Sequence, residues 1–236
     1  MAASSPTADL TLAPEDRDRP LRPRLVVLTV VTGLVDAVSY LALGHVFVAN
    51  MTGNVVFLGF ALAGASDFSI PASLIAIAAF LGGALAGGRL GSSIGQHRSR
   101  FLAIAILVNL GLIGAALAVS AIAKVDASLV QYGLIALLAL AMGLQNATAR
   151  ALAVPDLTTT VLTLTLTGLA ADSTPAGGAN PRWARRLLAT AAMLLGAAVG
   201  AFVVLRAGVA AALALTFALL GVNAIGAYRV WSRTTT

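Results

Sequence analysis

The stretch TGLVDAVSYLALGHVFVANMTGNVVFLGFALAG, residues 32–64, gathers polar and turn-forming residues inside long apolar sequence. It contains an acid, Asp36, and a short polar segment, NMTGN, at residues 50–54. Its glycines stand at positions 33, 44, 53, 59 and 64. Glycine permits sharp turns and close approach of helices, and polar side chains inside apolar sequence need a partner. We therefore expect the rest of the chain to be arranged around this stretch.

The composition places most of the chain in a lipid bilayer. Hydrophobic residues make up 59% of the 236 residues, charged residues make up only 10%, and the mean hydropathy is +0.94. A soluble domain carries about 25% charged residues. Because a spanning helix needs about 20 apolar residues, the chain has room for about eight crossings and none for a separate soluble domain.

Several apolar runs are long enough to cross a bilayer as helices. We predict an all-α polytopic membrane protein with six spanning helices and two short interrupted or half helices. Eight spanning helices are the alternative. The six long runs cover residues 25–43, 70–90, 101–123, 129–149, 187–205 and 209–230, and the two short ones, 45–65 and 156–171, are interrupted by residues 50–54 and by threonines at 158, 159, 160, 163 and 165.

The lysines and arginines favour six crossings, because basic residues concentrate on the cytoplasmic side. With six crossings, 13 of the 15 basic residues lie on that side, and only Lys124 and Arg206 lie outside. With eight, the division is 10 to 5. The six-span arrangement puts both ends of the chain in the cytoplasm. Since the basic residues flank apolar runs, we expect the lipid bilayer as their partner and no nucleic acid.

Two weakly similar halves follow one another. The segment GLVDA at 33–37 resembles GLQNA at 143–147 at an offset of 110, and TGN at 52–54 aligns with TLT at 163–165 at 111. With three crossings per half, the halves must lie in opposite orientations, which is a design of transporters and channels. The expected organisation is a disordered cytoplasmic tail (1–24), a first membrane half (25–123), a second membrane half (124–231) and a short C-terminal tail (232–236).

Glycines four residues apart form small-residue motifs that let helices pack closely. Gly83 and Gly87 in the first half align with Gly196 and Gly200 in the second at an offset of 113. These pairs fit a homodimer contact, and packing of the two halves against each other is at least as well supported.

Asp36 is the acid placed deepest in a predicted span. It stands eleven residues into the first run, about 17 Å from the cytoplasmic end of a bilayer core about 30 Å thick. An acid at this depth marks a proton, cation or substrate site by default. Arg150, Ser39 and Tyr40 are candidate partners. The alternative is a protonated carboxyl that fastens helices together.

The segment around Gly53 brings together the amides of Asn50 and Asn54 and the hydroxyl of Thr52. If a half helix begins near Asn54, its N-terminus presents N–H groups that favour an anion or a carboxylate. Helix capping is an alternative reason for Thr and Asn at these positions.

The second half offers further polar residues. Asn146 and Arg150 lie one helical turn apart and so share a face. Arg150 also has the simpler interpretation of reaching to the lipid headgroups, and the threonines near 163 can bond back to their own helix. The candidate contacts for a transported solute are Asp36, Asn50, Thr52, Gly53, Asn54, Gln145, Asn146, Arg150 and Thr163.

The sequence contains no pattern typical of an enzyme, such as a phosphate-binding loop, a nucleophile elbow or paired carboxylates within a span. It has no cysteine and two widely separated histidines, His45 and His97, so it predicts no metal site. We expect neither catalysis nor a cofactor.

The segments at 32–64 and, more loosely, AMGLQNATARALAVPDLTTTVLTLTLTGLA at 141–170 resemble the YoaK-like family of bacterial multi-spanning membrane proteins. The resemblance runs from about residue 24 to residue 230, and ANMTGN at 49–54 is its most specific part. Such proteins tend to carry a Thr-Gly-Thr step where this chain has Thr163, Leu164 and Thr165. The resemblance implies a bacterial inner-membrane location and no particular substrate.

These observations support the hypothesis of a small secondary transporter or permease for a small polar solute or ion, with the two interrupted segments facing each other. The rival hypothesis is a membrane assembly or regulatory protein that transports nothing, in which the buried polar residues only join helices.

Overall fold

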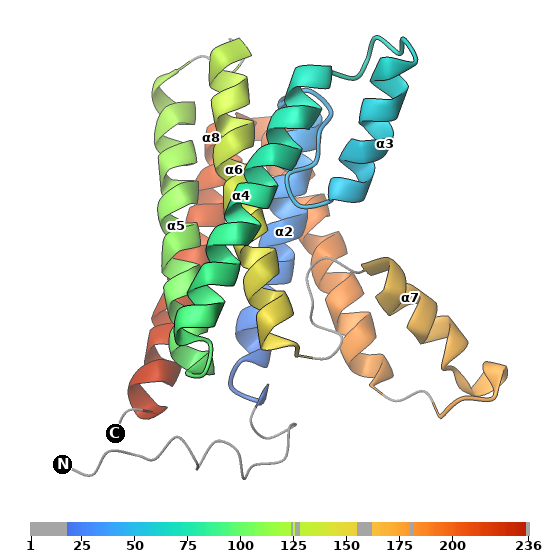
Figure 1. The fold of residues 1–236 in the computed structure, drawn as a ribbon, viewed down its shortest axis with the longest axis vertical. Coiled ribbons are helices and arrows are strands. Elements are labelled where there is room, and N and C mark those ends of the chain that lie inside the picture. The colour runs from blue at the N-terminus through green and yellow to red at the C-terminus, as the bar shows by residue number, and fades with distance from the viewer. Residues whose placement is uncertain (1–17, 124, 126–127, 155–161, 180–181, 235–236) are drawn as a thin grey trace.

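The computed structural model describes residues 18–123, 125, 128–154, 162–179 and 182–234, and every regular element in these ranges is helical. Figure 1 shows the helices as one bundle with two short helices at its side. The predicted all-α membrane fold is confirmed, since five described helices are long and apolar enough to cross a bilayer. The elements are α2 (Arg22–Ala42), α3 (Met51–Leu62), α4 (Ile70–Ile94), α5 (Arg98–Ile122), α6 (Ser128–Leu152), α7 (Leu162–Ala171), a 3₁₀ turn (Thr174–Ala176) and α8 (Trp183–Thr234).

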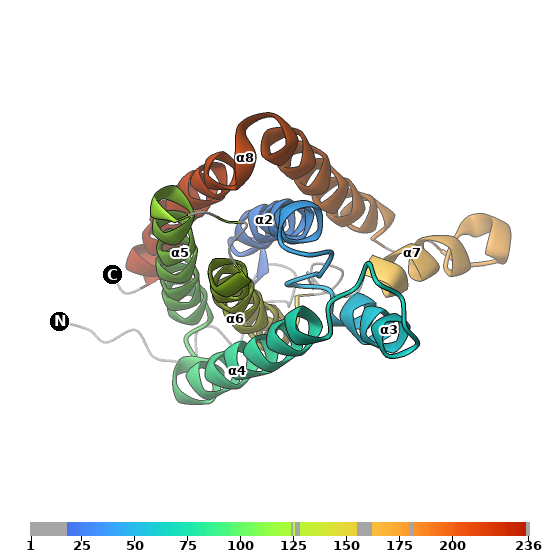
Figure 2. The ribbon, with the colours of Figure 1, turned by 90° about the horizontal axis from the view of Figure 1, so that it is seen from above.

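Helices α2 and α6 form the centre of the bundle. Seen from above in Figure 2, α4, α5 and α8 surround them. In the most apolar windows of α2 and α6, 61% and 50% of residues are buried, compared with 28–39% in the outer helices. The outer faces carry exposed leucines such as Leu81 and Leu205. The outer surface is therefore apolar, as a lipid-facing surface must be.

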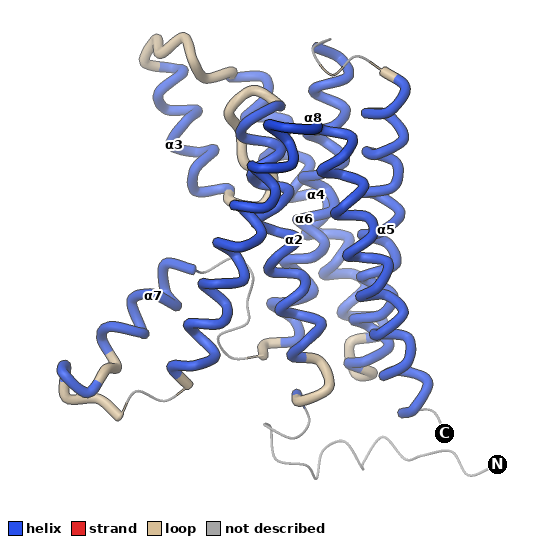
Figure 3. Tube along the Cα trace, turned by 180° about the vertical axis from the view of Figure 1, so that it is seen from behind, coloured by secondary structure: helices blue, strands red, loops and turns tan. Residues whose placement is uncertain are grey.

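Helix α8 consists of two arms that meet at Gly208. Gly208 has φ 83° and ψ 178°, a conformation that glycine adopts easily and other residues do not. Figures 1 and 3 show that both ends of α8 lie at the same end of the bundle. The two arms correspond to the separate apolar runs predicted at 187–205 and 209–230. Six apolar helical segments therefore run along the bundle.

The short helices α3 and α7 each occupy only part of its length. After α2 the chain turns at Gly44 (φ 91°) and His45 (φ 56°) and returns toward the middle of the bundle. Helix α3 then leads back to the end of the bundle from which the chain came, and α7 leads in the same way to the opposite end (Figures 1 and 3). The chain thus has the two short helices predicted, and they enter from opposite ends.

The interruption in the first half lies earlier than predicted. Helix α3 begins at Met51, so residues 52–54 form its first turn and the non-helical segment covers residues 43–50. Helix α7 begins at Leu162, so Thr163 and Thr165 are helical as well. Thr158, Thr159 and Thr160 lie outside the described residues.

Small residues allow two close helix contacts, α2 with α8 and α4 with α6. A Cβ atom at any of four glycines would collide with a backbone carbonyl of the facing helix. The homodimer through Gly83/Gly87 or Gly196/Gly200 remains a prediction, and the chain's own helices already cover these positions. The colliding pairs are Gly33 with Met193, Gly196 with Val30, Gly143 with Phe80 and Gly83 with Leu140.

We expect Gly143→Ala to lower the stability of the protein, because the added methyl group forces α4 away from α6. Overpacking of this kind costs about 1–3 kcal/mol. Gly111→Ala is the matched control, since a Cβ at this helical glycine meets nothing within 4 Å. Thermal unfolding of the purified variants in detergent measures the difference. Equal melting temperatures for Gly143→Ala and wild type would contradict the close contact between α4 and α6.

The absence of native cysteine allows a test of membrane orientation. Ser66, after α3, and Gln96, before α5, are exposed and lie beyond opposite ends of α4. We expect a membrane-impermeant maleimide added to intact cells to label Ser66→Cys and not Gln96→Cys. Both cysteines should react in opened membranes. Labelling of Gln96→Cys alone would contradict the predicted orientation and indicate the opposite one.

Candidate functional site

Asp36 holds the backbone of the segment that returns into the bundle. Its side chain is buried, and Oδ1 accepts hydrogen bonds from the backbone N–H groups of Val48 (3.0 Å) and Ala49 (2.8 Å). Of the partners expected from the sequence, Ser39 donates to the backbone carbonyl of Asp36 instead of the carboxyl. The carboxyl therefore satisfies non-helical backbone that has no strand or helix partner.

Asn54 holds the same segment from the other side. Its side chain is fully buried, Oδ1 accepts from the N–H of Phe47 at 2.8 Å, and Nδ2 donates to the carbonyl oxygen of Phe47. One amide thus pairs with both backbone groups of one residue, as a neighbouring strand would. Asp36 and Asn54 together bind the N–H groups of residues 47–49 and the carbonyl oxygen of Phe47.

The other residues of the NMTGN segment have different surroundings. Asn50 is the N-cap of α3, but its side chain makes no capping bond, and both Asn50 and Thr52 are exposed. Gly53 leaves room for the ring of Phe47, which a Cβ atom would touch. Thr163 is exposed in the first turn of α7. Among the described residues, none of these side chains hydrogen-bonds to the carboxyl of Asp36.

A row of aromatic rings fills the space around the first returning segment. Tyr40 stacks on Phe47 with ring centroids 5.1 Å apart and meets His45 edge-on at 5.3 Å. Phe57 stacks on Phe47 at 5.7 Å and on Phe68 at 4.8 Å. This packing joins the end of α2, the returning segment and α3.

Gln145 belongs to an internal network. Its Nε2 donates to Thr32 Oγ1 (2.8 Å) and to the carbonyl oxygen of Leu28 (3.1 Å), and its Oε1 accepts from Asn109 Nδ2 (2.8 Å). All of these side chains are buried, so the network joins α2, α5 and α6. Sequence reasoning missed Asn109, although a lone amide inside an apolar run was the signal available.

Asn146 and Arg150 line a cavity of about 650 Å³ between α4 and α6. Asn146 is nearly buried at 7% exposure, whereas Arg150 is exposed. The two share a helix face, as their spacing predicted. The lining residues are Phe80, Ala84, Gly88, Asn146, Ala147, Arg150 and Ala151.

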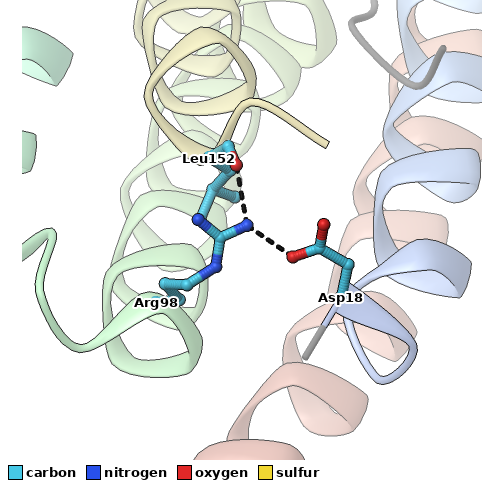
Figure 4. Close-up of polar contacts among 3 residues, drawn as sticks. All are labelled: Asp18, Arg98 and Leu152. Atoms are coloured by element: carbon cyan, nitrogen blue, oxygen red, sulfur yellow. Dashed lines mark hydrogen bonds and ion pairs between the residues drawn. The ribbon is translucent and has the colours of Figure 1, made fainter. Parts of the chain in front are cut away.

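Two other arginines join elements at the end of the bundle where α6 finishes. Arg98 donates to Asp18 Oδ1 and to the carbonyl oxygen of Leu152, both at 2.7 Å, as Figure 4 shows. Arg186 on α8 binds Asp172 at 2.7 Å and the carbonyl oxygen of Gly168, which anchors the end of α7. Both guanidinium groups therefore hold the scaffold together.

The predicted site residues thus fall into separate groups. Asp36 and Asn54 hold the first returning segment, Gln145 fastens the centre, and Asn146 with Arg150 faces the cavity. Within the part of the chain that the structure describes, no three side chains form a candidate metal site.

We expect Asp36→Ala to lower thermal stability strongly, because it leaves the N–H groups of Val48 and Ala49 without an acceptor. Each buried unpaired group costs about 1–3 kcal/mol. Asp36→Asn keeps an oxygen at this position, so it should retain most of the stability. Thr52→Ala, at an exposed position nearby, serves as the control. Equal melting temperatures for Asp36→Ala and Thr52→Ala would show that the carboxyl does not hold the segment.

Comparison with known proteins agrees with a membrane protein. Residues 24–226 match the family described as "Protein of unknown function (DUF1275)". The "UPF0700 transmembrane protein YoaK" of Bacillus subtilis (strain 168) is 34% identical over 149 residues, which cover 63% of this chain and 65% of that protein. The chain thus matches slightly less than two thirds of its relative's length.

No solved structure shows significant similarity to the chain. The match to the family runs from the first turn of α2 into the last turns of α8, through both short helices and the cavity. The protein is therefore an integral membrane protein that belongs to the DUF1275 family and resembles YoaK.

Proposed function

We propose that the protein is a small secondary transporter or permease of the bacterial inner membrane, with both chain ends in the cytoplasm. The observation that carries the proposal is the pair of short helices, α3 and α7, which begin beside the bundle and lead to opposite ends of it (Figures 1 and 3). Transporters use interrupted helices of this kind near the bilayer midplane to form a solute site. The sequence contains no enzyme motif that would favour a catalytic function instead.

An inverted repeat accounts for the two close helix contacts. Gly33 of α2 faces the backbone of Met193, and Gly143 of α6 faces that of Phe80. Each member of one pair corresponds to a member of the other at the sequence offsets of 110 and 113. The first helix of each half therefore packs against a helix of the other half. This exchange supports two halves related by a pseudo-twofold axis, the arrangement on which alternating access depends.

The cavity beside Asn146 and Arg150 is the proposed entry for the solute. It lies between α4 and α6, at a contact between the two halves, where a rocking motion would change its width. Its volume falls within the range of about 300–1,000 Å³ that is usual for small-molecule sites. In the first half, Tyr40 stands at the sequence position that corresponds to Arg150, and its ring stacks on Phe47.

Coupling to a proton or cation would act through the first returning segment. Asp36 accepts two backbone hydrogen bonds there. A protonated carboxyl has less acceptor capacity than a carboxylate. Protonation would therefore weaken the hold on residues 48 and 49 without removing it, and so ease a movement of this segment.

A membrane assembly or regulatory protein is the second candidate. The network of Gln145, Asn109 and Thr32 favours it, because these buried side chains hydrogen-bond to one another across three helices and face no cavity large enough for a solute. In this role the remaining polar residues would likewise serve only to join helices.

We expect purified protein in lipid vesicles to take up at least one member of a panel of small polar solutes faster than protein-free vesicles. Ala151→Cys places a thiol in the cavity wall, and Ser92→Cys places one on α4 outside it. Reaction with a bulky maleimide should block solute uptake by the Ala151→Cys variant and leave uptake by the Ser92→Cys variant unchanged. Absence of uptake across the panel would favour the second candidate. Equal uptake by both modified variants would remove the cavity from the pathway.

A further inference from the structure

The cavity between α4 and α6 has the chemistry of a site for a negatively charged group. We propose that it binds the carboxylate, phosphate or sulfate group of a small organic anion, with Arg150 as the main contact and Asn146 as the second. This inference rests on the proposed transport function, for which it names the class of solute.

Arg150 differs from the structural arginines at the same end of the bundle. Arg98 and Arg186 each bind a carboxylate and a backbone carbonyl oxygen. Arg150 makes no hydrogen bond or ion pair within the ranges that the structure describes, and it stands at the cavity wall. Its guanidinium group is therefore available to a ligand. Guanidinium groups bind carboxylates and phosphates through two parallel hydrogen bonds.

The composition of the wall supports an anion over a cation. Its seven residues include one cationic side chain, no acidic one and the amide of Asn146. Near the low-dielectric interior of a membrane protein, a positive charge at such a wall attracts an anion more strongly than it would in water. A cation would meet repulsion at the same place.

The rest of the wall is apolar and suits an organic body. Phe80, Ala84 and Gly88 of α4 face Arg150 and Asn146 of α6 across the cavity. A ligand with a charged end and an apolar part would thus contact both helices at once. A small hydrated inorganic ion would use only the polar wall.

The first half lacks this charge. Tyr40 stands at the position that corresponds to Arg150, and its ring packs against His45 and Phe47. Asp36 corresponds to Asn146 and is engaged by backbone N–H groups. The anion site therefore belongs to the second half alone.

Two sources could supply the anionic group, a soluble solute or the headgroup of an anionic lipid. The experiment separates them with two arms. In the first, the full-length protein in neutral detergent is titrated with acetate, butyrate, succinate, sulfate and inorganic phosphate, and with the ammonium compound choline as a cationic probe. In the second, it is titrated with phosphatidylglycerol. Thermal unfolding reports binding, because a ligand of the folded state raises the melting temperature.

We expect organic anions to stabilise wild type in a saturable manner and choline to have no effect. Arg150→Gln should raise the apparent dissociation constant about tenfold or more, as loss of a charged hydrogen-bonding partner does. Arg150→Lys should fall between the two, because it retains charge without the planar fork. Arg89→Gln, an exposed arginine on α4 outside the cavity wall, should bind as wild type does.

Stabilisation that survives Arg150→Gln, or stabilisation by choline alone, would overturn the proposal. Stabilisation by phosphatidylglycerol alone, lost in Arg150→Gln, would retain the anion site and assign it to lipid, which overturns the solute. Uptake of cationic or neutral solutes with no effect of anions would refute this inference and leave transport intact. Anion binding that depends on Arg150, without solute uptake by vesicles, would support the anion site and refute the proposed transport.

Discussion

The fold depends on how the backbone at residues 47–49 obtains hydrogen-bond partners inside the bundle. Backbone that is neither helix nor strand is tolerated at membrane depth only when protein or water satisfies it. Here Asp36 accepts from Val48 and Ala49, and Asn54 pairs with both backbone groups of Phe47. These contacts hold the segment that returns into the bundle after α2. Helix α3 then leads back to the end at which α2 finished, and α4 starts from that end, so this turn sets the direction of the helices that follow (Figure 1).

The sequence was sufficient to predict the scaffold because apolar length and glycine spacing are local properties. The gap between the runs at 187–205 and 209–230 coincides with the turn at Gly208. Glycines at matching positions in the two halves lie at the predicted close contacts. The start of α3 was less predictable. Asn54 is helical while its side chain serves a residue seven positions earlier, so its polarity suggested a break that lies before it.

Site residues were harder to group, because neighbours along a helix point about 100° apart. Gln145 turns toward α2 and α5, whereas Asn146 faces the cavity beside α4. Sequence proximity placed both in one candidate site. The partners of Asp36 were also unpredictable, since backbone N–H groups are present at almost every residue and leave no signal in the sequence. Asn109 has no aligned motif around it, and only its contact with Gln145 reveals its place.

The two halves that we propose have similar glycine contacts between helices but different polar side chains. The glycines that let helices approach correspond closely, while Asp36 and Tyr40 in the first half stand where Asn146 and Arg150 stand in the second. Tyr40 stacks on Phe47, whereas Arg150 lines a cavity. Under the proposed function, a symmetric scaffold supplies two alternative arrangements of similar energy, and the unlike side chains decide how each end opens. In this proposal, the guanidinium group of Arg150 would attract the solute, and the carboxyl of Asp36 would hold the returning segment in place.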